Sequence, residues 1–474
     1  MNATYCDNLA DVLCVNQVRI DFTDKPITAW GGMGVLMGKL LEKIQFRDWV
    51  ERHVPIIETS PNAGGVYEKV LGQMLTVLGG GYRFAHSMLW NHGVEALKRV
   101  LGVDWLPLAA STLTRFWNKI ETQAVVEQLA DSSRILAKTI VGWEKIGEDN
   151  LNLDASVLTR YGTQQGAITG YNPKKPGRPS HHPLLAFLSS GYVVNVWNRS
   201  GDCHAGQGAV DFFRQTILAL GSSFRVKRVL CDSSFYQIDF IDHLQDHGYR
   251  YIMAVPLWPI FQRQIMRLQH WQQIDDGIEV AEFEFKHFDP KWTRALRYVA
   301  IRQEIAVRPK ASGKQPSLFQ EIEELKNYRF GLLTCNEQQL LPEEVWREYR
   351  PRANDENVVK DLKEGYGFAA FSLDNFWATE AVMIMNALVF HNLIHYLNRQ
   401  IINPQPPVEQ LKTLRIKYFI VPAQLGTEAR YSVLRLGVQQ GKFRDKITSL
   451  LRDIANIPHN LFNCNAVEYN SASG

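Results

Sequence analysis

The sequence lacks several features that would assign it quickly to a class. Its six cysteines are scattered with no CxxC pair, which argues against a zinc knuckle or a disulfide framework and indicates a reducing cytosol. No charged leader followed by an apolar run opens the chain, and no clean run of about eighteen apolar residues occurs. The nearest candidate, 376–397, is interrupted by charged, amide and imidazole side chains. We therefore expect a buried helix there and no membrane partner.

A surplus of charge of one sign is also missing. The 52 Lys and Arg residues oppose 49 Asp and Glu residues, so the net charge of +3 gives no global argument for nucleic acid. Any basic surface must be local. At 474 residues and 45% hydrophobic content, the chain exceeds the size at which a single core stops growing, so we expect two to four structural units.

The first part of the chain, 1–147, is predicted to be mainly helical. Leu36, Leu40 and Ile44 recur at i,i+4 spacing and give one helix an apolar face. The run Ser111 to Ile120 offers a hydroxyl cap followed by a helix. A helix-turn-helix that grips duplex DNA and an ordinary helical bundle both fit this pattern.

Residues 148–256 change to alternating strands and helices, which predicts a sheet covered by helices. Asp154 lies in or at the end of the strand 151–157, and the strand 226–231 runs into Asp232. Loops at strand ends present functional groups, so both aspartates are candidates for a site. Each has a structural alternative, Asp154 as a turn residue and Asp232 as a helix N-cap.

A stiff basic loop, GYNPKKPGRPSHHP over 170–183, lies between the first two strands of this region. Proline at this density holds the backbone extended, so Lys174, Lys175 and Arg178 project from it. Such a loop beside a carboxylate suits a phosphate backbone, and a solvated surface loop is the alternative. We interpret His181 and His182 as loop residues or DNA contacts rather than metal ligands.

A β-rich insertion is predicted over 257–345, because strand-like runs occur at 295–307 and 328–335. Trp258, Trp271 and Trp292 in it could stack on an unpaired base, although core packing explains each of them. After a further helical stretch, 346–400, the chain is predicted to end in a C-terminal helical region, 401–474. His391 and His395 have the i,i+4 spacing of zinc enzymes but lack the glutamate that would follow, so we disfavour a metal site there.

The stretch YRPRANDENVVKDLK, 349–363, places a carboxylate among cations. If Pro351 occupies the first turn of one continuous helix, Arg352, Glu356, Lys360 and Lys363 fall within an arc of about 80°. Alone, this pattern is typical of a solvated surface helix with i,i+4 ion pairs. Together with Asp154 and Asp232, however, Glu356 could bind a pair of Mg²⁺ ions through hard oxygen ligands and support an in-line displacement at phosphorus.

Two sequence motifs resemble a known family. Tyr349, Arg352, Glu356 and Lys363 have two, three and six intervening residues, which is the YREK signature of DDE transposases in the insertion-sequence four group. The stretch LNLDASVLTRYGTQQGAITGYNPKKPGRPSHHPLL more narrowly resembles the insertion-sequence family thirteen-eighty. The second aspartate departs slightly from the pattern, because Ser234 stands where glycine is common.

The resemblance implies an α/β fold with a ribonuclease H-like catalytic core in two parts, 148–256 and 346–400, split by the β-rich insertion. It implies that Asp154, Asp232 and Glu356 bind the metal, which is Mg²⁺ with Mn²⁺ as a substitute. Tyr349, Arg352 and Lys363 would contact DNA near the scissile phosphate, with Lys360 beside them, and the N-terminal region would bind element ends. The implied partners are double-stranded DNA, as element ends and target, and a second copy in a homodimer, in the bacterial cytoplasm at the nucleoid.

The function we expect is therefore cleavage at the ends of an insertion sequence, followed by transfer of the 3′-OH ends to target DNA. A nuclease of the same fold without strand transfer is one alternative. A DNA-binding protein derived from a transposase, without turnover, is another.

Overall fold

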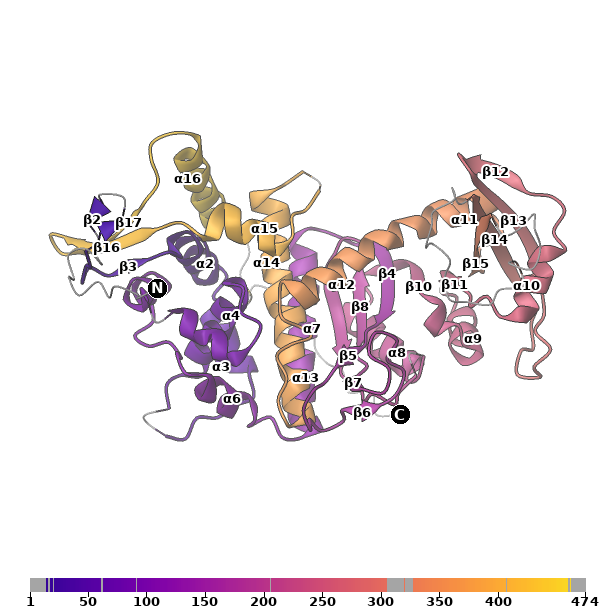
Figure 1. The fold of residues 1–474 in the computed structure, drawn as a ribbon, viewed down its shortest axis with the longest axis horizontal. Helices are drawn as coiled ribbons and strands as arrows, with labels where there is room; N and C mark the ends of the chain where they lie inside the picture. The colour runs from indigo at the N-terminus through magenta and orange to yellow at the C-terminus, as the bar shows by residue number, and fades with distance from the viewer. Residues whose placement is uncertain are drawn as a thin grey trace, which may run out of the picture.

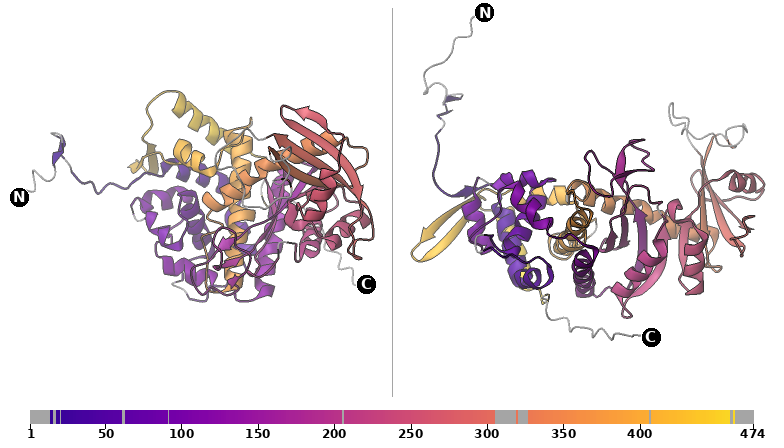
Figure 2. Two further views of the ribbon diagram at one scale, coloured as in Figure 1. Left: turned by 45° about the vertical axis from the view of Figure 1, so that its right-hand side comes forward. Right: turned by 90° about the horizontal axis from the view of Figure 1, so that it is seen from below.

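The computed structural model describes residues 14–15, 18–19, 21–60, 63–90, 92–204, 206–304, 319, 327–405, 407–458 and 461. The molecule is elongated, with helices of the N-terminal part at one end and the strands of a large sheet at the other (Figure 1). Helix α7 (Gln123–Trp143) packs against α13 (Phe376–Ile384), from a distant part of the chain, between these ends. The elongated shape is also visible from below (Figure 2).

The N-terminal part is a helical bundle preceded by short strands. The apolar face predicted at Leu36, Leu40 and Ile44 is fully buried. Helix α6 buries Leu113, Phe116 and Trp117 against the bundle. This packing is that of an ordinary bundle helix. The elements are β1 (Cys14–Val15), β2 (Val18–Arg19), β3 (Ile27–Thr28), α2 (Gly31–Lys43), α3 (Phe46–His53), α4 (Val66–Leu78), η1 (Phe84–Trp90), α5 (Val94–Leu101), α6 (Ala110–Trp117) and α7 (Gln123–Trp143).

A nine-stranded mixed sheet, in the order β12-β13-β14-β15-β11-β10-β4-β8-β9, forms the other half of the molecule. Its centre is parallel, because β10 pairs in parallel with both β4 and β11, and all other pairs are antiparallel. The strands are β4 (Glu148–Ala155), β8 (Leu184–Leu188), β9 (Val193–Trp197), β10 (Arg225–Cys231), β11 (Tyr251–Ala254), β12 (Gln272–Asp275), β13 (Ile278–Phe285), β14 (Leu296–Glu304) and β15 (Tyr328–Cys335). The helical connections are α8 (Ala209–Leu220), η2 (Ser233–Phe235), α9 (Ile238–Asp246) and α10 (Pro259–Met266).

The strands expected within the insertion belong to this same sheet. Strand β15 returns to pair with β11, at Ile252 opposite Cys335, so β12 to β15 continue the central strands. The region 257–345 is therefore β-rich as predicted, but the nine strands are hydrogen-bonded into one continuous sheet.

The sheet has two different faces. Leu153 and Cys231 point into the large hydrophobic core, whereas Leu230 and Ile252 belong to a smaller cluster on the opposite face. Helix α11 (Pro342–Tyr349) covers that smaller cluster by inserting Val345, which is fully buried. The chain then continues along this face towards the middle of the molecule (Figure 1).

The prediction of one continuous helix from Pro351 to Lys363 is wrong in its first turn. Helix α11 ends at Tyr349, a 3-10 turn, η4, covers Arg350–Asn354, and α12 begins afresh at Asp355 and runs to Glu364. Pro351 contributes to the interruption, because proline has no N–H to donate to an α-helix that would run through it. Arg352 and Lys363 therefore do not share one regular α-helix.

The basic loop lies in a small three-stranded sheet that leaves the main sheet between β4 and β8. Its strands are β5 (Leu158–Thr159), β6 (Ile168–Thr169) and β7 (Pro179–His181). The interpretation of His181 and His182 as DNA contacts is wrong, because both are buried. The His181 Nε2 atom lies 3.0 Å from the Gln165 carbonyl oxygen, and the His182 Nδ1 atom lies 2.9 Å from the Cys203 carbonyl oxygen.

Among the described residues, one helical stretch, Phe376–Ile402, is long and apolar enough to cross a membrane. Because 94% of its most apolar window is buried inside the protein, it is the core helix that the interrupted pattern predicts. Two π-helical turns interrupt its regular α-helix. Its parts are α13 (Phe376–Ile384), η5 (Met385–His391), α14 (Asn392–Leu397) and η6 (Asn398–Ile402).

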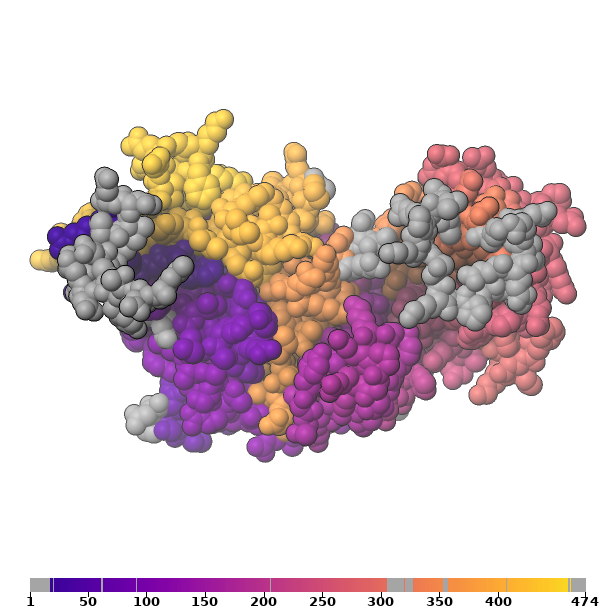
Figure 3. Space-filling model, in the orientation of Figure 1, coloured from indigo at the N-terminus to yellow at the C-terminus, as the bar shows by residue number. Residues whose placement is uncertain are grey.

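The prediction that 401–474 is a helical region is also wrong, because this region contains a β-hairpin. Strand β16 pairs with β17 and also with β3, at Ala423 opposite Thr28. The C-terminal surface therefore lies against the N-terminal one (Figure 3). Ala429 adopts a positive φ of 53° at the hairpin turn. The elements are α15 (Leu411–Leu414), η7 (Arg415–Phe419), β16 (Ala423–Glu428), β17 (Tyr431–Leu436) and α16 (Lys442–Ala455).

Candidate active site

The two candidate aspartates stand side by side at the carboxyl ends of two parallel strands. Leu153 of β4 and Cys231 of β10 are register partners, so Asp154 and Asp232 follow at equivalent positions on neighbouring strands, about 4.8 Å apart in backbone spacing. Side chains alternate along a strand. Because Leu153 and Cys231 enter the large core, both carboxylates face the opposite side, where α11 and α12 lie.

The Asp154 carboxyl is in an unusual electrostatic environment. Burial raises its pKa, Arg352 opposes this rise, and the negative charge of Asp232 adds to it, so that the pKa reaches about 6. Its side chain is 23% exposed. Because burial disfavours the ionised form of this carboxyl, a bound cation would stabilise that form. Such shifted pKa values are typical of functional sites.

Asp232 combines two roles, as a cap and as the neighbour of Asp154. It caps the turn η2. Its Oδ1 atom accepts one hydrogen bond from the Ser234 backbone N–H at 3.0 Å and a second hydrogen bond from the Ser234 hydroxyl. The sequence predicted Asp232 as the N-cap of the helix that follows; Asp232 instead caps the 3-10 turn η2, and Gln237 is the N-cap of α9. Ser234, which departs from the family pattern, supplies a hydroxyl that glycine would lack.

Tyr349 and Arg352 bond to the backbone of the two strands. The Tyr349 hydroxyl donates to the Cys231 carbonyl oxygen at 2.9 Å. The Arg352 Nη2 atom donates to the Leu153 carbonyl oxygen at 3.2 Å and lies 3.6 Å from Asp154 Oδ1. The sequence motif did not reveal these partners.

Glu356 lies in the first turn of α12, and its side chain is outside the described residues. Its convergence with the aspartates stays a prediction. Among the described side chains, no group of three or more His, Cys, Asp and Glu residues is placed to hold a metal ion. Asp154 and Asp232 by themselves offer the hard oxygen donors that Mg²⁺ and Mn²⁺ prefer, so the chemistry of this pair fits such an ion.

Lys363 links the carboxylates to the basic loop. Burial lowers its pKa, Asp154 raises it and Lys174 lowers it, so this ammonium group lies within electrostatic reach of both. Lys360, one turn earlier, is exposed. Lys363 on α12 is therefore the cation that lies between Asp154 and Lys174 of the basic loop.

The basic loop is exposed at its cations and fixed at its base. Lys174, Lys175 and Arg178 are exposed, as the proline-rich sequence predicts. Buried Asn172 donates to the Thr159 hydroxyl at 3.0 Å and accepts from the Lys175 backbone N–H at 3.1 Å. We missed Asn172 from the sequence, where the signal was an Asx residue two positions before the first lysine.

The buried histidines form no metal site among the described residues. The rings of His391 and His395 stack with their centroids 5.5 Å apart, and the His395 Nε2 atom lies 2.9 Å from the Ser190 carbonyl oxygen. Burial lowers the pKa of His391 to about 3 and that of His395 to about 4. Both rings are therefore neutral core residues.

Comparison with known proteins identifies the family. The chain is similar to a solved structure described as "Cryo-EM structure of piggyBac transposase synaptic complex with hairpin DNA", with 11% identity, 93% of this chain and 89% of that chain covered, and a TM-score of 0.39. No curated protein matches the chain. The family described as "Transposase DDE domain group 1" matches residues 11–458. Since this match spans nearly the whole chain, the protein belongs to that family of DDE transposases.

Proposed function

We propose that the protein cleaves DNA at the ends of an insertion sequence and transfers the 3′-OH ends to target DNA by two-metal-ion phosphoryl transfer. The observation that carries this proposal is the placement of Asp154 and Asp232 on adjacent parallel strands, facing the same side. Family membership supports the transposase activity. The spacing of Tyr349, Arg352, Glu356 and Lys363 supports the YREK group, and the 152–185 stretch supports family thirteen-eighty.

The core is proposed to be ribonuclease H-like. The strand order β9-β8-β4-β10-β11 supports this, with three antiparallel strands leading into parallel strands connected by α8 and α9. Asp154 stands on β4, the central strand of this order. The units 148–256 and 346–400 would form this core, and 1–147 would bind the element ends.

Asp154, Asp232 and Glu356 would hold the divalent ions, Mg²⁺ or Mn²⁺. These ions activate the attacking oxygen and stabilise the leaving oxygen when they are bound. The chain itself keeps the aspartates ready, because Ser234 orients Asp232 and Arg352 supplies a positive charge to Asp154. Double-stranded DNA would be the substrate, and two copies of the chain would bring two ends together in the bacterial cytoplasm.

The cations near the aspartates would bind DNA phosphates. Lys363 reaches electrostatically towards both Asp154 and Lys174, so a phosphate beside the carboxylates would be contacted from α12 and from the basic loop. Lys175 and Arg178 extend this surface, and Lys360 is exposed on the same helix as Lys363. Such contacts position the substrate without reading its sequence.

The decisive experiment measures Mn²⁺-dependent cleavage of element-end DNA by the intact chain and by Asp232→Asn. We expect a loss of about a thousandfold or more, because the metal site supplies several kcal/mol of transition-state stabilisation. Asp239→Asn, an exposed carboxylate on α9, is the matched control and should retain activity. Equal cleavage by Asp232→Asn and the control would reject the site.

The same reactions separate transposase from nuclease. Products in which the freed 3′-OH end is joined to target DNA support strand transfer, whereas cleavage with no joined product supports the nuclease alternative. Binding to element ends with no cleavage at all would favour the DNA-binding alternative.

Neutralising Lys174, Lys175 and Arg178 to glutamine tests the basic loop. Each lost phosphate contact should flatten the slope of log affinity against log salt by about 0.9, so we expect a total decrease of about 2 to 3. Neutralising Lys138 and Arg214, on α7 and α8, serves as the control. An unchanged slope in the loop variant would mean that this loop does not touch DNA.

A further inference from the structure

The segment that joins α11 to α12 crosses the ends of both aspartate-bearing strands. Tyr349 bonds to the carbonyl of Cys231, and Arg352 bonds to the carbonyl of Leu153. These carbonyls belong to the residues immediately before Asp232 and Asp154, and the two residues are register partners. One short segment therefore holds the two strand ends at matching positions.

Both side chains point into the protein. Tyr349 packs against the smaller hydrophobic cluster, and the Arg352 side chain is only 16% exposed. The pairing of β4 with β10 stops at Leu153 and Cys231. Carbonyls at the end of a ladder need a partner from elsewhere, and the hydroxyl and the guanidinium provide one.

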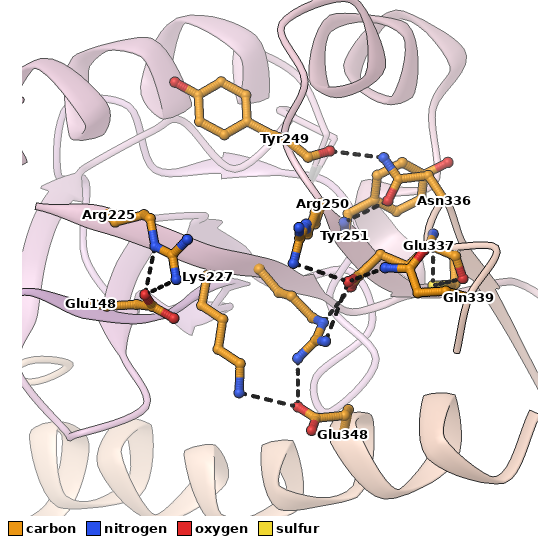
Figure 4. A network of polar contacts seen from close by, with 12 residues as sticks. Glu148, Arg225, Lys227, Tyr249, Arg250, Tyr251, Asn336, Glu337, Gln339 and Glu348 are labelled. Atoms are coloured by element: carbon orange, nitrogen blue, oxygen red, sulfur yellow. Dashed lines mark hydrogen bonds and ion pairs between the residues drawn. The ribbon is translucent and has the colours of Figure 1, made fainter. Parts of the chain in front are cut away.

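The same segment is fixed to β10 at a second point. Glu348 precedes Tyr349 in α11, and its carboxylate forms an ion pair with Arg228 Nη1 at 2.7 Å. Arg228 lies on β10, three residues before Cys231. Arg228 also pairs with buried Glu337 through its Nε atom, and its Nη2 atom lies 3.3 Å from that carboxylate. Figure 4 shows the polar network around Glu337 and Glu348. Helix α11 therefore has two polar attachments to β10, one of them directly before Asp232.

We propose that Tyr349 and Arg352 are positioning residues, which set the spacing between Asp154 and Asp232 through the two carbonyls and so control binding of the divalent ion. This inference rests on the proposed function.

The test compares Mn²⁺ binding and DNA binding in the full chain. Tyr349→Phe removes one hydroxyl and keeps the ring. We expect about tenfold weaker Mn²⁺ affinity, measured without DNA by electron paramagnetic resonance, because residues that orient metal ligands have effects of this size. The salt slope of binding to element-end DNA should not change.

Arg352→Lys is the second variant. Lysine keeps a point charge that would still bind a phosphate, but it lacks the planar guanidinium that reaches the Leu153 carbonyl. We expect weaker Mn²⁺ binding and an unchanged salt slope here as well. Tyr431→Phe, at an exposed tyrosine of the β16–β17 hairpin, is the control for both measurements. Urea unfolding of each variant confirms that it is folded.

The outcomes distinguish this inference from the proposed function. If Asp232→Asn weakens Mn²⁺ binding and Tyr349→Phe does not, the positioning role is overturned while the metal site stands. If Asp232→Asn leaves Mn²⁺ binding intact, the proposed metal site itself fails.

Discussion

Two arginines meet carboxylates on the same face of the sheet, but their surroundings differ. Arg228 is 7% exposed and pairs with both Glu337, which is 3% exposed, and Glu348. Arg352 has one carboxylate partner, Asp154, at 3.6 Å, and its Nε atom is buried with no hydrogen-bond partner in the described part of the chain.

The comparison separates a structural cluster from a functional one. Buried polar groups in folded proteins are normally hydrogen-bonded, so the unpaired Arg352 Nε atom distinguishes this cluster from the one around Arg228. Around Arg228, each charge has close opposite charges. Around Arg352, Asp154 is the one carboxylate within ion-pair distance among the described side chains, and burial together with the charge of Asp232 raises the pKa of Asp154. The following predictions test this difference, beginning with the largest effect.

Arg228→Met should lower the free energy of unfolding by about 3 to 5 kcal/mol, because among the described residues it leaves buried Glu337 with Arg250, at 3.5 Å, as its cationic partner and Gln339 as a neutral one. Arg352→Met should cost less than half as much. Asp154 can take up a proton when its partner is lost, since its pKa is already about 6. Urea unfolding at pH 7 measures both variants, and equal losses would contradict the distinction.

Asp154→Asn should stabilise the metal-free protein at pH 7.5 by about 3 kcal/mol. The folded pKa of about 6 lies above the ordinary value of 3.8, so the folded state binds the proton more tightly and its stability falls as pH rises from 3.8 to 6. Asparagine resembles the protonated acid and removes this loss.

The gain from Asp154→Asn should shrink to less than half at pH 4.5, where the folded carboxyl is protonated. Urea midpoints at the two pH values measure it, with Asp239→Asn as an exposed control. A gain that is the same at both values would mean that burial of the Asp154 charge does not penalise folding.

Lys227→Gln should have the smallest effect, below about 0.5 kcal/mol. Lys227 is 42% exposed and its Nζ atom lies 3.8 Å from Glu348, so solvent screens the pair. The measurement is urea unfolding in low salt. A loss above about 1.5 kcal/mol would show that the whole network acts as a unit and that Arg228 alone does not account for its stability.

Local patterns predicted much of the fold. The apolar spacing at Leu36, Leu40 and Ile44 identified a buried helix face, and the strand before Asp232 was correct to the residue at its C-terminal end. The exposed cations of the proline-rich loop were also predicted. These features depend on neighbours within a few residues, which the sequence displays directly.

Other features depended on distant contacts. The hairpin at Ala423 to Leu436 joins β3, near the start of the chain, and its strands had been expected as helix. The burial of His181 and His182 also depends on distant partners, Gln165 and Cys203. The 3-10 turn around Pro351 is different, because proline is a visible local signal: the sequence placed Pro351 in the first turn of the helix, and the regular α-helix begins only at Asp355.

The sequence by itself determined that Asp154 and Asp232 lie at the ends of strands. Side chains alternate along a strand, so once a strand is placed in the sheet, this alternation fixes the face on which its aspartate lies. Only the tertiary structure decided that β4 and β10 are neighbours in register, and that Tyr349 and Arg352 reach the carbonyls before the aspartates. The reason is physical: periodicity records which side of an element is apolar, but the distant segment that covers this side is chosen by the packing of the whole chain.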